Sequence, residues 1–310
     1  MTQRVSIVLV LAGLTLPASA APGDVLFFDD FEGGASAANY FLVADTSRPP
    51  GTTGNAASDS FDAAFAYTDL GQAGDVRSGT GGRFLTEDAL TAFVNGVIVN
   101  GSVPISITYD LYMDPSSSGS TEYNFVGVGN VTAPFQHYLR GSLIGNEETQ
   151  GVFAGGLTDS DTAGSGDYVL LESAGGVASP IDLFDGDATG NAQDGTSFAD
   201  ILPAGTPGPS GESVPARILQ HRWVSVEFLI DGNAVSYFYD DQLIATATSS
   251  TNAVGRLGIG IGDPFPSSNQ GMRVPPTADT SVIIDNVRIT EVPEPATASL
   301  LALSAAALLR

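Results

Sequence analysis

Acidic side chains and one asparagine are concentrated in a glycine-rich stretch beyond the middle of the chain. Asp185, Asp187, Asn191 and Asp194 lie close together in sequence, with glycines between them. Hard cations such as Ca²⁺ take several oxygen ligands from a flexible loop, and this spacing supplies them. The stretch is not an EF-hand, because Thr196 stands where the closing glutamate would be if Asp185 were the first ligand. The sequence predicts a calcium loop, with a metal-free acidic surface loop as the alternative.

The sequence offers few residues for a catalytic site. The chain has two histidines, His137 and His221, which are far apart in sequence. This excludes a histidine-rich zinc site, and no nucleophile elbow supports a Ser-His-Asp triad. Asp240 and Asp241 are adjacent, so on a strand their side chains would point to opposite faces. We interpret this pair as a solvated turn and expect a non-catalytic protein.

The charge balance narrows the possible partners. The 310 residues contain 11 Lys and Arg against 35 Asp and Glu, which gives a net charge of −24, and every cation is an arginine. A nucleic-acid partner is excluded, because phosphate binding needs a basic face. Negative charge favours divalent cations as ligands. The chain has no cysteine, so neither disulfides nor thiol chemistry stabilises it.

The elements that would position these residues are strands. In 103–111, apolar residues alternate with Ser106, Thr108 and Asp110, which predicts a half-buried strand. Two alternating runs, 223–230 and 234–239, flank an Asp-Gly turn and predict a hairpin. A second tight turn is expected at 240–241. Further strands are expected at 26–31, 40–44, 61–67, 93–99, 123–129, 137–144, 168–172, 242–248, 256–262 and 281–290.

These short strands indicate an all-β sandwich in one domain, 23–290. The 37 glycines and 18 prolines separate the strands at fairly regular spacing, and no long helical segment intervenes. The stretch 173–215, which is rich in Gly, Ala, Asp, Pro and Ser, interrupts this regular spacing of strands. We expect it to be a loop-rich surface insertion, since strands of one type lie on both sides of it.

Several of these runs resemble a known family. The central hairpins of laminin-G-like, concanavalin A-like jelly rolls are similar to RWVSVE (222–227), the Asp-Gly turn and YFYDDQL (237–243). An early strand, FDDFE (28–32), and a closing strand, IIDNVRI (283–289), are similar to that family's first and last strands. The resemblance implies a jelly-roll β-sandwich over 23–290 in which the first and last strands lie side by side.

The resemblance also bears on activity. Glycoside hydrolases with this fold carry a strand motif Glu-x-Asp-x-x-Glu, whose carboxylates share one face. Glu227 and Asp231 come nearest to it, but Asp231 falls at the turn and no second glutamate follows. Sugar binding would need exposed aromatic side chains. Trp223, the single tryptophan, is expected in the core or at a strand edge, and the tyrosines are numerous enough to form a platform.

A second calcium site is implied between the first and last strands. Alternation in 281–290 places Asp285 on the same face as Ile283, Val287 and Ile289. If that face is buried, the carboxylate needs a cation or hydrogen-bonding partners, because an unpaired buried charge is too costly. Asp30 or Glu32 would complete the site, as related jelly rolls imply. An arginine partner, or a face exposed to water, is the alternative.

The N-terminus is typical of an exported protein. Arg4 supplies a positive charge, 5–16 is apolar, and small residues follow at Ala18 and Ala20. This pattern predicts a signal peptide over 1–20, handled by the Sec machinery and cleaved after Ala20.

The C-terminal segment 291–310 resembles a PEP-CTERM sorting signal. Pro293, Glu294 and Pro295 are followed by an uncharged apolar run, 296–309, and the chain ends at Arg310. The prolines prevent a helix or strand from running through them. The apolar run is shorter than the ~20 residues of a membrane-spanning helix. The resemblance implies processing by an exosortase-type membrane protease, with at most transient anchoring.

Together these features predict an exported, non-catalytic protein of the cell envelope or extracellular matrix of a Gram-negative bacterium. Its expected role is structural or adhesive, with extracellular polysaccharide as a candidate partner and Ca²⁺ as a candidate cofactor. The alternative is a carbohydrate-active enzyme, a glycoside hydrolase or lyase, with a diverged site on the same fold.

Overall fold

The computed structural model describes residues 23–44, 60–85, 89–114, 123–130, 150–157, 168–174, 177–184, 198–209, 211, 214, 216–250, 253–262 and 281–292. The predicted signal peptide, the strand expected at 137–144, the acidic loop from Asp185 to Asp194 and the tail from Pro293 lie outside these residues. Within them, no helix has both the length and the apolar character needed to cross a membrane.

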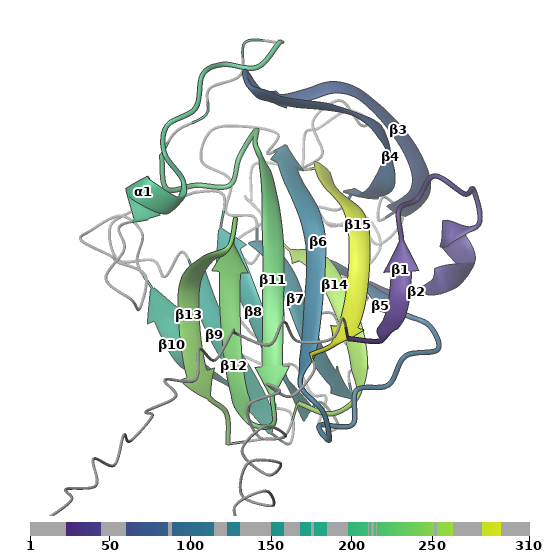
Figure 1. Ribbon diagram of the computed structural model, residues 1–310, viewed down its shortest axis with the longest axis vertical. Coiled ribbons are helices and arrows are strands. Elements are labelled where there is room, and N and C mark those ends of the chain that lie inside the picture. The colour runs from purple at the N-terminus through teal and green to yellow at the C-terminus, as the bar shows by residue number, and fades with distance from the viewer. Residues whose placement is uncertain are drawn as a thin grey trace, which may run out of the picture.

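Two antiparallel sheets form a sandwich, which confirms the predicted all-β class (Figure 1). Sheet A contains, in spatial order, β13 (Gln242–Thr248), β12 (Ala234–Tyr239), β11 (Trp223–Asp231), β6 (Ile105–Asp114), β15 (Ser281–Glu291), β4 (Asp75–Leu85) and β3 (Ser60–Gln72); β1 (Val25–Asp29) also pairs with β15. Sheet B contains β10 (Val177–Phe184), β9 (Tyr168–Ala174), β8 (Gln150–Leu157), β7 (Tyr123–Asn130), β14 (Arg256–Gly262), β5 (Ala89–Val94) and β2 (Tyr40–Ala44). Among the described residues, two short helices, η1 (Ser36–Asn39) and α1 (Phe198–Ile201), lie outside the sheets.

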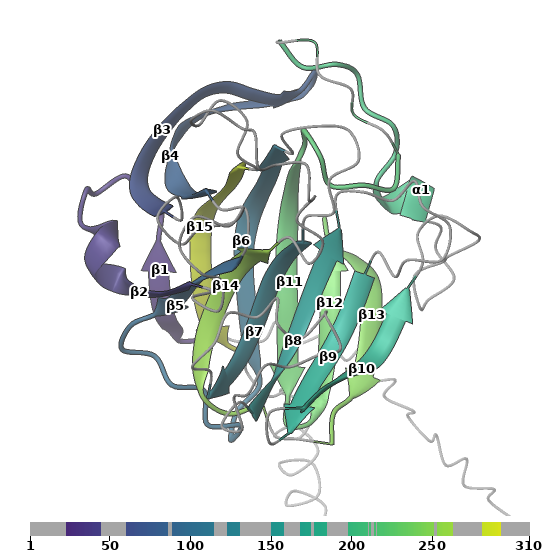
Figure 2. The same cartoon turned by 180° about the vertical axis from the view of Figure 1, so that it is seen from behind.

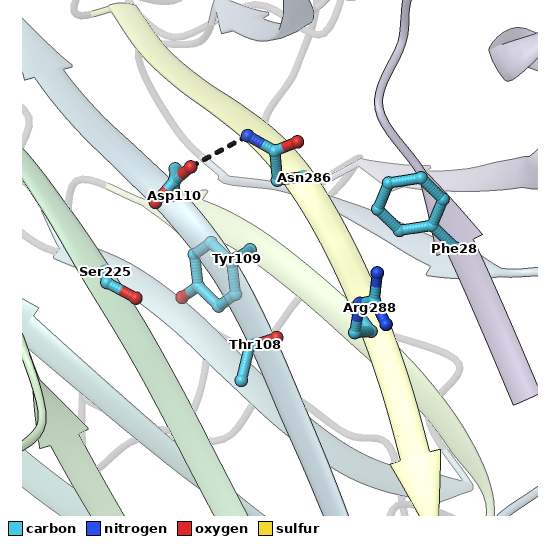
Figure 3. Close-up of a pocket in the computed structure, with 7 residues that line it drawn as sticks. All are labelled: Phe28, Thr108, Tyr109, Asp110, Ser225, Asn286 and Arg288. Carbon is cyan, nitrogen blue, oxygen red and sulfur yellow. Dashed lines mark hydrogen bonds between the residues drawn. The ribbon is translucent and has the colours of Figure 1, made fainter. Parts of the chain in front are cut away.

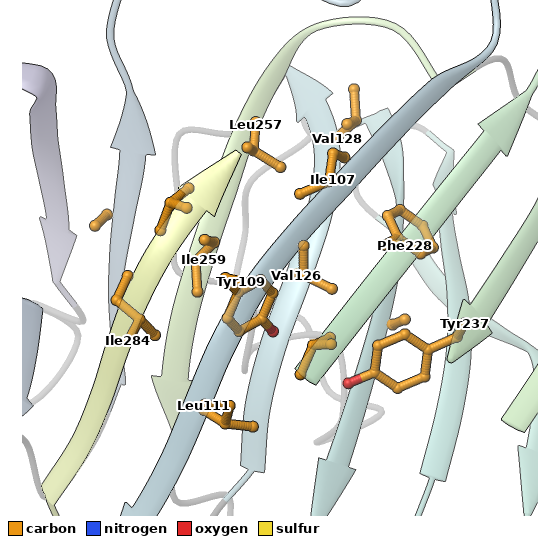
Figure 4. Close-up of a cluster of buried hydrophobic side chains, with 14 of the residues drawn as sticks. Ile107, Tyr109, Leu111, Val126, Val128, Phe228, Tyr237, Leu257, Ile259 and Ile284 are labelled. Carbon is orange, nitrogen blue, oxygen red and sulfur yellow. The ribbon is translucent and has the colours of Figure 1, made fainter. Parts of the chain in front are cut away.

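Alternation along the strands divides side chains between the core and the surface. On β6, Ile107, Tyr109 and Leu111 are buried between the sheets, together with Val126 of β7 and Phe228 of β11 (Figure 4). The residues between them on β6 point away from the core. Removing this apolar surface from water is the main driving force for folding.

The predicted hairpin at 223–239 is confirmed. β11 and β12 pair with Asp231 opposite Ala234, and Gly232 in the turn has a φ of 59°, which glycine adopts without strain. The second predicted turn is also present, because Asp240 and Asp241 connect β12 to β13 with φ values of 48° and 62°. Positive φ at both central residues is what a type I′ hairpin turn requires.

The first and last strands lie side by side, as expected. Phe28 of β1 is opposite Arg288 of β15, and Asp29 is opposite Val287. Beyond the paired residues, the Glu291 amide donates a hydrogen bond to the Asp24 carbonyl oxygen at 2.9 Å. The two ends of the described fold therefore meet at one place on the surface.

A β-bulge in β15 overturns the predicted orientation of Asp285. Asp285 is opposite Asp110 of β6, but the register then shifts before Arg288, and Asn286 has a φ of 52°. The extra residue reverses the alternation. Asp285 therefore points outward, like Ile283, whereas Val287 and Ile289 point into the core. The prediction that these four residues share one face was wrong.

Three strands were not predicted: β4, β8 and β10. β10 lies inside the stretch 173–215 expected to be loop-rich and pairs with β9 at one edge of sheet B. The strand expected at 93–99 begins earlier and ends at Val94. Glycine-rich or proline-containing segments such as these lack the clear period of two that identifies a strand.

β3 and β4 form a long hairpin, which we call the arm. β4 pairs with β15 over 82–85, and the remainder of the hairpin arches over the outer face of sheet A (Figures 1 and 2). The Trp223 indole Nε1 donates to the Leu70 carbonyl at 3.1 Å, and the Thr206 hydroxyl donates to the Ala73 carbonyl at 3.3 Å. These bonds hold the far half of the arm against the rest of the molecule.

Candidate functional site

An open pocket of about 290 Å³ lies on the outer face of sheet A. It is lined by residues of four neighbouring strands, β1, β15, β6 and β11: Phe28, Thr108, Tyr109, Asp110, Ser225, Asn286 and Arg288 (Figure 3). The pocket is mixed in character, with a carboxylate, an amide, a guanidinium, hydroxyls and one partly exposed aromatic ring. Only Tyr109 belongs to a group considered from the sequence, the tyrosines of a possible sugar platform, and its side chain is buried in the core.

The alternation of β6 and the bulge of β15 together position the polar groups. Thr108 and Asp110 point outward because their neighbours on β6 fill the core. The bulge turns Asn286 outward, next to Asp110, so that its Nδ2 donates to Asp110 Oδ2 at 2.8 Å. A positive φ in a residue other than glycine is uncommon and is often found at functional sites.

A row of five residues crosses the sheet at the level of the pocket. Each is the register partner of the next, from β1 to β12, and we call them the cross-strand row: Phe28, Arg288, Thr108, Glu227 and Phe238. Four steps of ~4.8 Å between strands give the row a length of about 19 Å. An aromatic ring stands at each end. Phe28 is 46% exposed, with the Arg288 guanidinium 4.8 Å from its ring centre.

Carboxylates flank the cross-strand row on the side nearer the arm. Asp285, Asp110 and the backbone of Ser225 follow one another across β15, β6 and β11. Asp240 in the following turn accepts a hydrogen bond from the Ser225 amide at 2.8 Å. Burial raises the pKa of Asp240, and hydrogen bonding from Ser225 opposes that shift.

Asp285 is the most deeply placed of these carboxylates. One oxygen accepts a hydrogen bond from the Tyr67 hydroxyl of the arm at 2.8 Å, and the other accepts one from the backbone amide of Asn286 at 2.7 Å. Burial raises the pKa of Asp285, while these two bonds act in the opposite direction. Asp285 is therefore partnered by hydrogen-bond donors, which is one of the two ways in which the sequence predicts that a buried carboxylate here could be stabilised.

The arm supplies a wall beside the pocket. Arg77 of β4 holds Asp75 through two hydrogen bonds, at 2.8 and 3.1 Å, and its third nitrogen lies 3.1 Å from Asp110 Oδ2. The same guanidinium lies 5.0 Å from the ring centre of Trp223. Trp223 is 3% exposed and packs on Tyr67 and Tyr112, so its expected burial is confirmed.

In the calcium site predicted between the first and last strands, each carboxylate has a hydrogen-bond partner of its own. Asp30 Oδ1 accepts from the Glu32 amide at 3.2 Å, and Glu32 Oε1 accepts from the Thr80 amide at 2.9 Å. Across the described ranges, no three His, Asp or Glu side chains are grouped so that they could hold a metal ion. The loop candidates Asp185, Asp187, Asn191 and Asp194 lie outside those ranges, so that site stays a prediction.

Sequence reasoning missed the pocket for identifiable reasons. Asn286 and Arg288 are one and three residues after Asp285, so strict alternation puts them on the opposite face. The only sequence signal of the bulge is the adjacent Asp and Asn. Arg77 lies in the glycine-rich strand β4, which the sequence pattern did not reveal. Phe28 was assigned to a strand, but its exposure depends on β1 being at the edge of the sheet.

No model of a protein family matches this chain, and no curated protein sequence matches it. Solved structures do match its fold. A protein of unknown function with a galectin-like fold from Bacillus subtilis is 8% identical, with a TM-score of 0.47, and the match covers 89% of this chain and 100% of that one. An endo-β-1,4-glucuronan lyase from the fungus Trichoderma reesei is 10% identical, with a TM-score of 0.44 and coverage of 87% and 96%. A carbohydrate-binding module from Bacillus subtilis is 10% identical, with a TM-score of 0.38 and coverage of 76% and 96%.

Proposed function

We propose that this protein is a non-catalytic, polysaccharide-binding protein that uses the outer face of sheet A. One observation carries the proposal: an open pocket with mixed hydrogen-bonding groups lies on a row about 19 Å long that has a phenylalanine at each end. Sugars present hydroxyls around an apolar ring face. Carboxylates, amides and guanidinium groups bond to the hydroxyls, and aromatic rings pack against the apolar face.

Four of the pocket residues have distinct roles in this proposal. Asp110 keeps acceptor capacity toward the pocket beyond its bonds to Asn286 and Arg77. The Asn286 amide carries both a donor and an acceptor, and Arg288 offers several donors. Phe28 is the exposed apolar surface on which a sugar ring would pack.

Affinity electrophoresis and calorimetry against a panel of purified polysaccharides test this function. Asn286→Gly removes the side chain and keeps the φ of 52° without strain. It is expected to weaken binding by about 2- to 10-fold, the usual value of one hydrogen bond to an uncharged partner. Ser236→Ala is the matched control, because Ser236 lies on the same sheet face but outside the pocket and bonds to Thr246. Failure to bind any polysaccharide, with the protein folded, would exclude this role.

A carbohydrate-active enzyme on the same fold is the second candidate. It is favoured by the pair Asp110 and Asp285, which are directly opposite each other on β6 and β15. Opposite side chains have Cβ atoms about 4.5–5.5 Å apart, and burial raises the pKa of Asp285, as a general acid requires. Release of new chain ends from a polysaccharide, lost in both Asp110→Asn and Asp285→Asn, would favour the enzyme. No release by the wild-type protein across the panel would reject it.

We also propose that the sandwich is a concanavalin A-like jelly roll, exported by the Sec machinery and cleaved after Ala20. The tail with Pro293, Glu294, Pro295 and Arg310 would then be processed by an exosortase-type protease, delivering the domain to the envelope or matrix. Mass spectrometry of the exported protein tests both cuts. A mature form that keeps residues 296–310 would refute processing.

The loop from Asp185 to Asp194 remains our candidate for bound Ca²⁺. A ligand that binds only the folded state raises its stability. Added calcium is therefore expected to raise the thermal unfolding midpoint of the full folded domain, and a chelator to lower it. An unchanged midpoint in both conditions would rule out a structural calcium site.

A further inference from the structure

The charges around the pocket restrict which polysaccharide it accepts. We infer that the cross-strand row binds an uncharged polysaccharide chain laid across the strands, and that the surrounding carboxylates exclude polyuronates. This inference rests on the proposed function and names the ligand class of the same site.

The first argument is the balance of charge at the pocket. Asp110 lies in its lining, Glu227 stands in the cross-strand row, and Asp285 and Asp240 lie beside it. Polymers with a carboxylate on every sugar would bring like charges next to these groups, and like-charge juxtaposition strongly disfavours a wrong partner. The protein as a whole adds to this effect, since its net charge is −24.

The second argument is that Arg77, one of the two guanidinium groups near the pocket, is already engaged by carboxylates. Arg77 is bound to Asp75 by two hydrogen bonds and to Asp110 by one ion pair. Arg288 lies over the Phe28 ring and keeps its hydrogen-bond donors, so it is a single cation among the carboxylates of the first argument. The bidentate, charge-assisted pair of Arg77 is among the stronger interactions of its kind, so a uronate would have to compete with an internal carboxylate. An uncharged sugar has no such competition.

The third argument concerns the direction of the chain. The two aromatic residues, Phe28 and Phe238, stand on β1 and β12, with three strands between them. The arm lies over Trp223, alongside the cross-strand row. A chain that uses both rings must therefore run across the strands and parallel to this wall.

Binding of a neutral glucan and of a polyuronate of similar length tests the ligand class. At low salt we expect the glucan to bind about tenfold or more tightly than the polyuronate. Added salt screens like charges, so polyuronate binding is expected to increase with salt while glucan binding changes little. Equal affinity for the two polymers at low salt would overturn the inference and leave the proposed function intact. If neither polymer nor the wider panel binds, the proposed function itself fails.

Two variants test the direction. Phe28→Ala and Phe238→Ala are each expected to weaken glucan binding severalfold, because each removes one stacking surface. Leu42→Ala, an exposed apolar side chain on sheet B, is the control for general loss of apolar surface. Loss of affinity in one variant alone, with both proteins folded by circular dichroism, would show that the chain does not span the row.

Discussion

Asp285 is a carboxylate that the fold keeps largely out of water, with one donor from the arm and one from the next backbone amide. Burial raises its pKa in the folded protein above the value in the unfolded chain. The folded state therefore holds this proton more tightly. Stability contributed through Asp285 is expected to decrease as pH rises through the raised pKa, because the charged form is the one that burial disfavours.

Asp285→Asn isolates this effect. Between about pH 4 and about pH 7, the unfolding free energy of the wild type is expected to decrease relative to that of the variant. In this interval the pH rises above the ordinary carboxyl pKa. Urea unfolding at several pH values measures it. Asp241→Asn is the matched control, because Asp241 is exposed in a turn and asparagine tolerates its φ of 62°. A pH-independent difference for Asp285→Asn would contradict the assignment.

Gly127 shows how closely the strands of sheet B approach one another. It lies opposite Phe153 of β8, and a Cβ atom there would overlap the Phe153 ring and lie 2.7 Å from the Val152 carbonyl oxygen. Gly127→Ala is expected to destabilise the protein by about 1–3 kcal/mol, the range for overpacking a filled site. Gly33→Ala is the control, because its added Cβ would have nothing within 4 Å. Equal urea midpoints for the two variants would contradict this account.

At the scale of elements, the arm depends on a few side chains for its position over sheet A. Arg77 contacts Asp110 of β6 and the ring of Trp223. Arg77→Met is expected to speed hydrogen exchange and proteolysis in the arm, with little change in the global unfolding midpoint, because partly exposed ion pairs contribute little to overall stability. Arg288→Met, on the far side of the pocket, should leave arm exchange at the wild-type rate. An arm that exchanges equally slowly in both variants would show that Arg77 does not hold it.

The sequence predicts elements well where alternation and turn chemistry agree. The hairpin of β11 and β12 was located closely because its alternating runs flank an Asp-Gly turn. The strand β2 was located closely because it is a short continuous run of apolar residues. β4 was missed because its central Ser-Gly-Thr-Gly-Gly segment offers few side chains to pack. In the arm, contacts from distant residues such as Trp223 determine the strand instead.

The candidate site was less predictable than the fold. The orientation of Asp285 depends on a bulge of one residue, and a single insertion in the register moves every later side chain to the other face. Strict alternation placed Asp285 on the same face as Val287 and put Asn286 and Arg288 together on the opposite face. That face lines the pocket. The alternation therefore grouped Asn286 and Arg288 correctly, but it did not show that the bulge turns Asp285 to the same side of the sheet.

At the scale of the whole molecule, the net charge of −24 is expected to oppose folding through self-repulsion. Added sodium chloride screens this repulsion, so the thermal unfolding midpoint should rise from low ionic strength to about 0.1 M, where the Debye length is about 10 Å. Differential scanning calorimetry measures the change. A midpoint that falls with salt would mean that attractive pairs such as Arg77 with Asp75 and Asp110 outweigh the repulsion.

The position of β15 also determines when the fold is able to form. β15 lies between β6 on one side and β1 and β4 on the other, so the strands made first join the rest of sheet A through the strand made last. Pairings between distant parts of a chain form slowly. During synthesis, sheet A cannot close until residue 291 is available. A nascent chain of this topology therefore keeps β1, β3 and β4 apart from β6 until β15 has been made.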